Sequence, residues 1–266
     1  FGSAYGNYWN PISDERPWMR IIKMMQAKDG TFYYTSCYGS TLYKSSDAIT
    51  WTNNGPVSAG NCAETVIEDS KGNLFLGVTD LSKEVGKIFK SADKGASWTE
   101  YALSGAKDTR PILETKDGTL FVGTRPNGDV FKSADGGVTW SNTGNLPDAT
   151  AVFALIEASD GAIYAAGVPA ATIWKSTDKG NSWTKATSLS DNPNSVITTL
   201  LQVSDGTFYA GASVGTYPQL AGKVFKSADG NVWTDITGSL QLSQVRSLLE
   251  SKNGFLYAAG VNGLYK

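Results

Sequence analysis

The apolar residues of this chain fall in short stretches that alternate with polar residues and are separated by turn-forming pairs such as Asp-Gly. A period of two residues is typical of β-strands, and Asp-Gly is a strong signal for a tight hairpin turn. Residues 119–123, Thr-Leu-Phe-Val-Gly, are a representative strand and follow the pair Asp117-Gly118. No apolar run is long enough to span a bilayer. The pattern predicts an all-β protein built from antiparallel hairpins.

The turns carry a repeated phrase, Ser-x-Asp-x-Gly-x-x-Trp. It is complete in residues 91–98, 133–140 and 176–183, and shortened copies end at Trp51 and Trp233. Successive copies of its tryptophan stand 42 to 50 residues apart. A repeat of this length is typical of a radial array of small sheets. The sequence therefore predicts a repeated architecture in which one face, built from loops, is the place to look for function.

Each repeat fits one template of four strands. The first strand is apolar and ends in Glu or Gln, the second is rich in aromatic residues, the third ends in Lys-Ser, and the fourth opens at the tryptophan. The Ser and Asp side chains of the phrase can hydrogen-bond the turn, and its Gly supplies a positive φ. Five aspartates are therefore interpreted as structural rather than catalytic: Asp47, Asp93, Asp135, Asp178 and Asp229. The same holds for the residues that end the first strands: Gln26, Glu68, Glu114, Glu157, Gln202 and Glu250.

The number of repeats predicts six blades. Five of them end near a tryptophan of the phrase: Trp51, Trp98, Trp140, Trp183 and Trp233. The sixth repeat stops at the end of the chain before its own hairpin phrase, and residues 3–9, which end at Trp9, align with residues 227–233. We expect this first segment to complete the last blade, which closes the ring and removes its open sheet edges. Residues 1–266 then form a single domain.

The phrase resembles the Asp-box, or BNR, repeat of sialidases, which are six-bladed β-propellers. The repeat also occurs in xyloglucan-cleaving glycosidases, sortilin-type receptors, photosystem assembly factors and some bacterial lectins. The resemblance covers the whole chain and implies a propeller of four-stranded antiparallel blades. It does not imply a particular activity, because a fold and the site it carries are separable.

Composition limits the classes of function. The formal net charge is −2 and the pI is near 5.3, which disfavours nucleic acids and anionic membranes as partners. The chain has no histidine, so hydrolytic mechanisms and metal sites that need an imidazole are excluded. We expect a monomeric domain with no cofactor, no metal and no insertion into a membrane.

The template leaves all five arginines of the chain unexplained. They lie in the variable loops or at the start of a first strand, positions that share one face in such an array. Guanidinium groups around a channel mouth suit a carboxylate or sulfate, which they bind as a fork. We predict a site for a glycan or protein ligand, with an anionic group, from these residues: Arg16, Trp18, Arg20, Tyr38, Arg110, Arg125 and Arg246. In the alternative, the arginines only pair with acidic residues such as Asp108.

Cys37 and Cys62 are the only cysteines. The template places both on the loop face in neighbouring blades, so they form either a disulfide or two unpaired buried thiols. A disulfide would stabilise the fold by about 3 kcal/mol and indicate an oxidising compartment. The expected location is therefore extracytoplasmic: secreted, periplasmic or at the cell surface.

The sialidase resemblance can be tested in the residues. That family carries Arg-Ile-Pro nine residues before an Asp-Gly turn, and here Arg20-Ile21-Ile22 stands nine residues before Asp29-Gly30 without the proline. The loop at residues 35–40 contains no Asp, and no Tyr and Glu pair can be assigned. A retaining mechanism needs an acid and a nucleophile at a defined separation. Neither the acid nor the nucleophile of a sialidase can therefore be assigned in this sequence.

Three classes of function stay open. We favour a non-catalytic, extracytoplasmic binding domain that recognises a glycan or a protein on its loop face. The alternative is a glycoside hydrolase, either sialidase-like or using two loop carboxylates. No pair stands out among the candidates: Asp14, Asp80, Glu84, Asp108, Asp148 and Asp191. The third class is a structural module of a larger surface protein or assembly.

Overall fold

The computed structural model describes residues 20–37, 42–55, 61–80, 84–261 and 263–266, and every regular element in them is a β-strand. The predicted all-β class is confirmed. The strands of the first half are β1 (Arg20–Gln26), β2 (Phe32–Cys37), β3 (Leu42–Ser45), β4 (Thr52–Asn53), β5 (Asn61–Glu68), β6 (Leu74–Asp80), β7 (Val85–Ser91), β8 (Thr99–Ala102), β9 (Asp108–Glu114), β10 (Leu120–Arg125), β11 (Asp129–Ser133) and β12 (Ser141–Asn145). Those of the second half are β13 (Ala151–Glu157), β14 (Ile163–Val168), β15 (Thr172–Ser176), β16 (Thr184–Ser188), β17 (Val196–Gln202), β18 (Phe208–Thr216), β19 (Gln219–Ser227), β20 (Thr234–Asp235), β21 (Gln244–Glu250), β22 (Leu256–Val261) and β23 (Gly263–Tyr265).

The strands pair antiparallel with their neighbours in the chain, except that β2 also pairs with β5. They form one eight-stranded sheet, three four-stranded sheets and one three-stranded sheet. The eight-stranded sheet is two consecutive four-strand meanders, joined where Cys37 of β2 lies opposite Cys62 of β5. We call each set of four consecutive strands a unit, numbered one to five, and β21–β23 the final group. The segment expected to complete that group, residues 3–9, lies outside the described residues.

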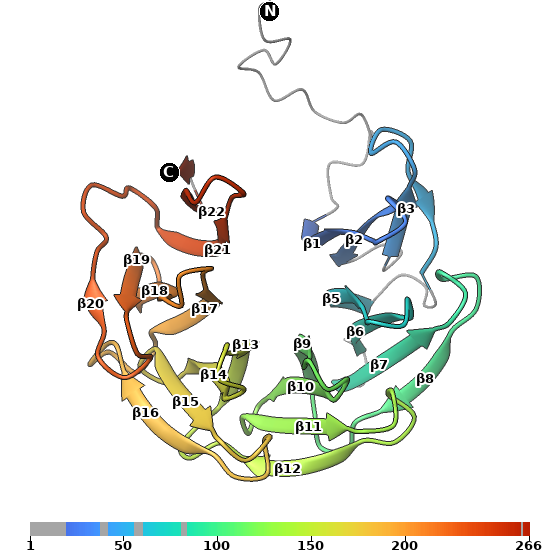
Figure 1. The fold of residues 1–266 in the computed structure, drawn as a ribbon, viewed down its shortest axis with the longest axis horizontal. Helices are drawn as coiled ribbons and strands as arrows, with labels where there is room; N and C mark the ends of the chain where they lie inside the picture. Colours follow the sequence, from blue (N-terminus) through green and yellow to red (C-terminus); the bar gives the residue numbers. More distant parts are fainter. Residues whose placement is uncertain (1–19, 38–41, 56–60, 81–83, 262) are drawn as a thin grey trace, which may run out of the picture.

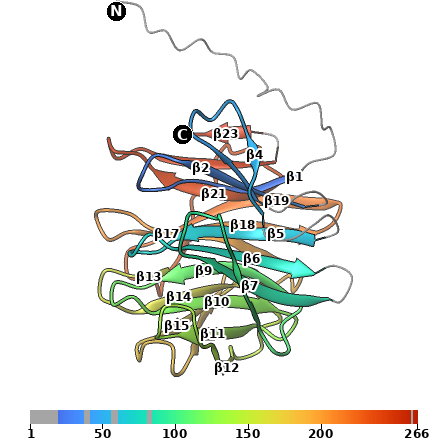
Figure 2. The same ribbon diagram turned by 90° about the vertical axis from the view of Figure 1, so that its right-hand side faces the viewer.

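The units follow one another around a common axis (Figure 1). The first strand of each unit lies nearest this axis and the fourth strand lies at the outside. From the side, inner strands such as β5 and β6 run roughly along the axis (Figure 2). The loops between second and third strands, and the connections between units, therefore meet at one end of the axis. We call this end the loop face.

Strand ends follow the predicted template closely. All six first strands end at the expected Glu or Gln, and the third strand of units one to five ends in Lys-Ser. The fourth strand begins one residue after the tryptophan rather than at it, as at Thr184 after Trp183. The reason is that the indole turns into the core: Trp183 is only 8% exposed.

One kind of hydrogen bond recurs between each described unit and the next. The backbone N–H of Lys116, in the turn after β9, donates to Glu157 Oε2 at the end of β13, over 2.7 Å. Equivalent bonds run from Lys28 to Glu68, from Ser70 to Glu114, from Ser159 to Gln202 and from Ser204 to Glu250. The residues that end the first strands thus satisfy backbone groups of the preceding unit, which is the structural role that their recurrence indicates.

The hairpins between third and fourth strands are stabilised internally. In unit four, the Ser176 hydroxyl donates to Asp178 Oδ1 over 2.8 Å and accepts from the N–H of Gly180. The Asp178 carboxylate also accepts from the N–H and the hydroxyl of Ser182. The Ser-to-Asp bond recurs in the other units: Ser45 to Asp47, Ser91 to Asp93, Ser133 to Asp135 and Ser227 to Asp229. These carboxylates are occupied in holding their own turns.

The hydrophobic cores lie between successive units rather than inside them. The core between units three and four, for example, combines Phe121 and Val130 with Leu155 and Trp174, which is fully buried. Four similar clusters occupy the other junctions between described units and the final group. The hairpin glycine belongs to this contact, since a Cβ at Gly180 would lie 2.4 Å from Phe121 Cε1 of unit three.

This contact predicts the effect of a single methyl group. Gly180 and Gly161 have similar positive φ values, 77° and 82°, but a Cβ at Gly161 would meet nothing within 4 Å. Gly161→Ala should lower the free energy of unfolding by about 1 kcal/mol, the cost of the left-handed backbone. Gly180→Ala should lower it by about 1 to 3 kcal/mol more, because the methyl group overpacks the core. Equal losses for the two variants in urea unfolding would contradict the contact.

The hairpins also predict how stability depends on pH. Hydrogen bonds from Ser182 and Ser176 hold the pKa of Asp178 at about 2, below its ordinary value of 3.8. A lowered pKa means that the carboxylate stabilises the fold above pH 4, and that this stabilisation is lost as the pH falls toward 2. The urea midpoint should therefore fall less steeply between pH 4 and pH 2 in Asp178→Asn than in the wild type. Asp191→Asn, which changes an exposed loop aspartate, should keep the wild-type slope, and identical slopes for all three proteins would refute the assignment.

Candidate functional site

Every first strand contains a β-bulge at its third or fourth residue. In β13, for instance, the pairing with β14 passes from Val152 directly to Ala154 and skips Phe153. In β9 the bulge includes Pro111, which has no N–H to give to the ladder. A bulge re-aims a side chain relative to the regular strand. The bulge residues are Ile22, Glu64, Arg110, Phe153, Thr198 and Arg246.

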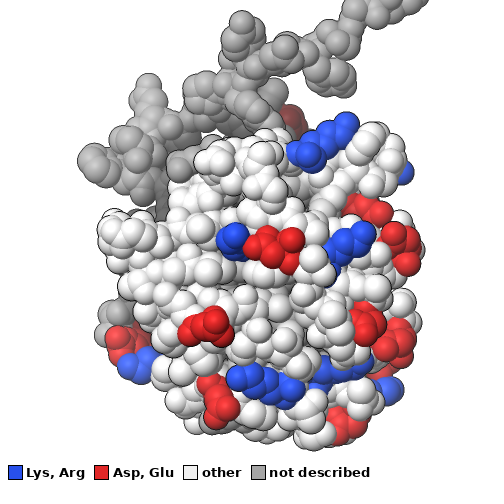
Figure 3. Space-filling model, turned by 90° about the vertical axis from the view of Figure 1, so that its left-hand side faces the viewer, with Lys and Arg blue, Asp and Glu red and all other residues white. Residues whose placement is uncertain are grey.

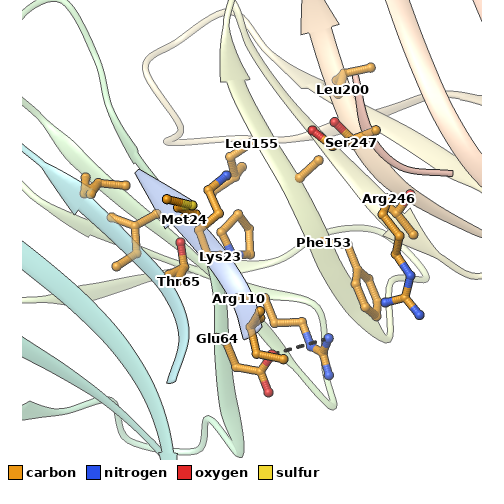
Figure 4. A pocket seen from close by; sticks show the side chains of 17 residues that line it. Lys23, Met24, Glu64, Thr65, Arg110, Phe153, Leu155, Leu200, Arg246 and Ser247 are labelled. Atoms are coloured by element: carbon orange, nitrogen blue, oxygen red, sulfur yellow. Dashed lines mark ion pairs between the residues drawn. The ribbon is translucent and has the colours of Figure 1, made fainter. Parts of the chain in front are cut away.

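All six bulge residues line one cavity on the axis, with a volume of about 470 Å³. Figure 4 shows the Arg110 and Arg246 side chains extending toward the same end of this cavity, with Phe153 between them in that view. Lys23 and apolar residues such as Met24 and Leu155 also contribute to the wall. The structure thus brings two of the predicted arginines together in a central channel: Arg110 from unit three and Arg246 from the final group.

Arg110 is held by three contacts. Its Nε donates to Asp108 Oδ2 over 2.9 Å, and Nη1 lies 3.8 Å from Glu64 Oε2. Its guanidinium carbon stands 4.6 Å from the centre of the Phe153 ring, in cation–π geometry. The side chain is a quarter exposed, so one edge of the guanidinium still faces the channel. This arrangement presents a fixed donor group rather than a flexible surface charge.

Arg125 also binds Asp108 but belongs to a different cavity. Its Nε lies 2.5 Å from Asp108 Oδ2, whereas its side chain, half exposed, lines a smaller cavity on the loop face. Asp108 itself is fully buried, and one carboxylate oxygen serves both arginines. The ion pairs of the alternative interpretation therefore exist for Arg110 and Arg125, and they anchor the guanidinium groups without removing them from the two cavities.

The remaining predicted ligand residues cannot be placed. Arg16, Trp18 and Tyr38 lie outside the described residues, and of Arg20 only the backbone is described, in β1 opposite Cys37. Arg20 stands two residues before the bulge at Ile22, the position that Asp108 occupies in β9. For this reason Arg20 stands nine residues before Asp29, whereas Arg110 and Arg246 stand seven residues before the matching positions of their own turns.

Two channel residues were missed by the sequence analysis. Glu64 and Phe153 occupy the bulges of β5 and β13 and line the same wall as the arginines. A strictly alternating pattern assigns every residue of a strand to one of the two faces of the sheet. It therefore cannot predict that a side chain points at the axis. The spacing to the following turn could have identified these residues. Each bulge residue stands seven positions before the third residue of that turn, as Arg110 does before Asp117.

Cys37 and Cys62 form a disulfide between units one and two. Their sulfur atoms and a carboxylate oxygen of Glu64 lie within 4.8 Å of one another, a grouping that would suit a metal ion if the thiols were free. Disulfide sulfurs are not thiolates, which are the form that binds metals. As it stands, this group offers one carboxylate to an ion.

The outer surface shows no comparable concentration of charge on the side drawn in Figure 3, where basic and acidic side chains are interspersed. The described part of the chain contains no helix of the length and apolarity needed to cross a bilayer.

Sheets set around a central channel are the signature of a propeller, and the family described as the DUF6242 beta propeller domain matches residues 70–206, just over half of the chain. The chain belongs to this family. No curated protein sequence matches the propeller.

Solved structures resemble the propeller in fold. The GH74 enzyme of Niastella koreensis is 20% identical with a TM-score of 0.67; the match covers 91% of this chain, but this chain spans only 41% of the enzyme. The extracellular domain of a putative one-component system of B. thetaiotaomicron is 12% identical, with a TM-score of 0.57 over 92% of this chain and 38% of that one. YCF48 bound to D1 peptide is 13% identical, with a TM-score of 0.56 over 92% and 90%. At these identities the likeness shows the fold alone.

Proposed function

We propose that the chain is a closed, six-bladed Asp-box propeller that acts outside the cytoplasm and binds an anionic group of a glycan or protein at the loop face of its channel. The observation that carries the function is the convergence of Arg110 and Arg246 on one cavity. The proposal has three steps: closure of the ring, the anion site and the location.

Closure is supported by two apolar residues at the ends of the array. Met24 in β1 is 48% exposed, while the residues at the same position of the other first strands are buried: Val66, Ile112, Leu155, Leu200 and Leu248, all at or below 9%. Leu249 in β21 is 61% exposed, while its equivalents pack into cores with the following unit: Met25, Ile67, Leu113, Ile156 and Leu201. Both residues lack only the neighbour that a closed ring supplies.

The hydrogen bonds between units support the same closure. Gln202 accepts from Ser159 of the preceding unit and donates its own amide to the carbonyl of Gly206 over 2.9 Å. Gln26 makes the matching amide bond to Gly30 over 3.1 Å. It is therefore oriented to accept from the N–H of Lys252 once the final group docks on unit one, with residues 3–9 adding the last strand.

The anion site follows from the closed ring. Closure fixes Arg246 of the final group across the channel from unit three, so two guanidinium groups face one space. A carboxylate, sulfate or phosphate can accept from both, and such charge-assisted bonds are about twice as strong as neutral ones. The Phe153 ring offers an apolar surface beside them, which suits the body of a sugar or a peptide. YCF48, a structural neighbour, was solved with a bound peptide.

The disulfide supports the proposed location, because such bonds persist in oxidising compartments and are rare in the cytosol. A neighbour that is an extracellular domain agrees with it. Secretion, the periplasm and the cell surface all meet this condition.

A glycoside hydrolase is the second candidate, because a GH74 enzyme shares the fold. Hydrolysis by the usual route requires two carboxyl groups flanking the bond. Among the described residues that line the channel, Glu64 is the one carboxylate, and it is ion-paired with Arg110. The channel as described therefore suits binding better than hydrolysis.

The anion site predicts how one substitution changes binding. A glycan array that pairs each uronate, sulfate or sialate glycan with its neutral counterpart, and a peptide array with free and amidated C-termini, provide the probes. The wild type should bind acidic members in preference to their neutral partners. Arg246→Gln should weaken that binding about 10- to 100-fold, the loss of roughly 1.5 to 3 kcal/mol expected for a hydrogen bond to a charged group.

Lys185→Gln provides the control, because it removes a positive charge from the exposed outer strand β16. It should bind as the wild type does. Binding that ignores the acidic group, or that falls equally in both variants, would contradict the site. Turnover of a fluorogenic sialoside or of xyloglucan that is lost in Glu64→Gln would instead establish the hydrolase.

A further inference from the structure

The strand that carries Arg246 is tied to unit five at its bulge. The pairing of β21 with β22 passes from Val245 to Ser247, so Arg246 is the residue that the bulge sets apart. The hydroxyl of Thr198, the bulge residue of β17, donates to the carbonyl of Val245, directly before Arg246. The same Oγ1 lies 3.1 Å from the carbonyl oxygen of Gly211 in β18. One hydroxyl therefore lies between unit five and the bulge of the final group.

Thr198 differs from the other bulge residues in what its side chain can do across a junction. Ile22 and Phe153 have no polar side-chain atom, and the Glu64 carboxylate only accepts hydrogen bonds. Thr198 is the one bulge residue with a hydroxyl, and its branched Cβ restricts χ1. This hydroxyl occurs in the unit that directly precedes Arg246.

The backbone beside Arg246 is held closely against unit five. Val245 is fully buried, and a Cβ at Gly211 would lie 2.6 Å from its Cγ1, so the two strands leave no spare room there. A bulge interrupts the hydrogen-bond ladder locally, and the bond from Thr198 supplies a restraint at that point. Arg246 itself is exposed, and this backbone sets the direction in which its side chain leaves the strand.

We infer that Thr198 is a positioning residue of the anion site, whose hydroxyl fixes the bulge of β21 so that Arg246 points at the channel. The inference rests on the proposed anion site and adds the residue through which unit five determines where Arg246 lies. Asp108 holds Arg110 in the same sense, through the side chain rather than the backbone. A donor that is already held in place loses less conformational freedom when an anion binds, which strengthens binding.

The first test needs no ligand, because ¹⁵N relaxation reports the order of the Arg246 backbone amide in the free protein. The wild type should show an order parameter of about 0.85, typical of a rigid backbone. Thr198→Val, which keeps the shape and removes the hydroxyl, should lower it, and Thr198→Ser should restore it. Thr143→Val is the matched control, because Thr143 Oγ1 donates to the carbonyl of Val130 over 2.8 Å in the outer part of unit three. It should leave Arg246 unchanged.

The second test titrates inorganic sulfate and follows the Arg246 amide by NMR. Thr198→Val should weaken sulfate binding about 2- to 10-fold, the cost of immobilising one long side chain. Thr198→Ser should stay within about twofold of the wild type, and Thr143→Val should match it. In the Arg246→Gln background, Thr198→Val should cause no further loss, because it acts through Arg246.

The outcomes separate this inference from the anion site itself. Unchanged order of Arg246 in Thr198→Val would overturn the inference, whatever sulfate does. A loss of sulfate binding that persists in the Arg246→Gln background would also overturn it, because Thr198 would then touch the anion directly. A wild type that does not bind sulfate, with lowered Arg246 order in Thr198→Val, would refute the anion site and keep the positioning role. Thr198→Ala replaces Thr198→Val if thermal unfolding shows that the valine variant does not fold.

Discussion

The constraint on which this structure depends is that no unit can bury its own apolar faces. Each four-strand sheet is one layer thick, so its core forms only against the next sheet. The recurring features of the sequence all serve that junction: a first-strand Glu or Gln accepts from the preceding turn, and a hairpin glycine admits the aromatic ring of the preceding unit, as Gly180 admits Phe121. An array of this kind leaves two faces without neighbours unless it returns to its start. The exposure of Met24 and Leu249 shows where those two faces are.

The same geometry explains why function and repeat occupy different residues. Contacts between units fix the strand ends, the hairpins and the sheet faces, and they leave little freedom there. The bulge of each first strand points a side chain at the axis, where it lines the channel and takes no part in the apolar cores between sheets. That position therefore differs from unit to unit, from Ile22 to Glu64 to Arg110, while the hairpin phrase hardly changes. The loop-face cavity beside Arg125 arises in the same way, from loops that the junctions do not constrain.

Much of the fold was predictable from the sequence, because alternation and turn residues act locally. The Glu or Gln that ends each first strand, the Ser-Asp hairpins and the buried Trp174 all lie where the repeat places them. The channel was predicted only in part. Arg110 and Arg246 were identified by elimination, but a bulge breaks the period of two, so the alternating pattern did not single out Glu64 and Phe153. The division of Arg110 and Arg125 between two cavities depends on the burial of Asp108, a tertiary property that no local pattern contains.

The central claim is that the final group docks on unit one and completes the ring, which would fix Arg246 across the channel from Arg110. Pulsed electron–electron double resonance measures this directly, with spin labels at Asn253 and Asp29. These are equivalent turn positions of the final group and unit one. The two cysteines of the chain form a disulfide, so introduced cysteines can be labelled selectively. The reference is the same measurement at Asp160 and Asp205, equivalent positions of adjacent units four and five. The account predicts the same narrow distance distribution for both pairs, and a longer or broad distribution for Asn253 and Asp29 would contradict it.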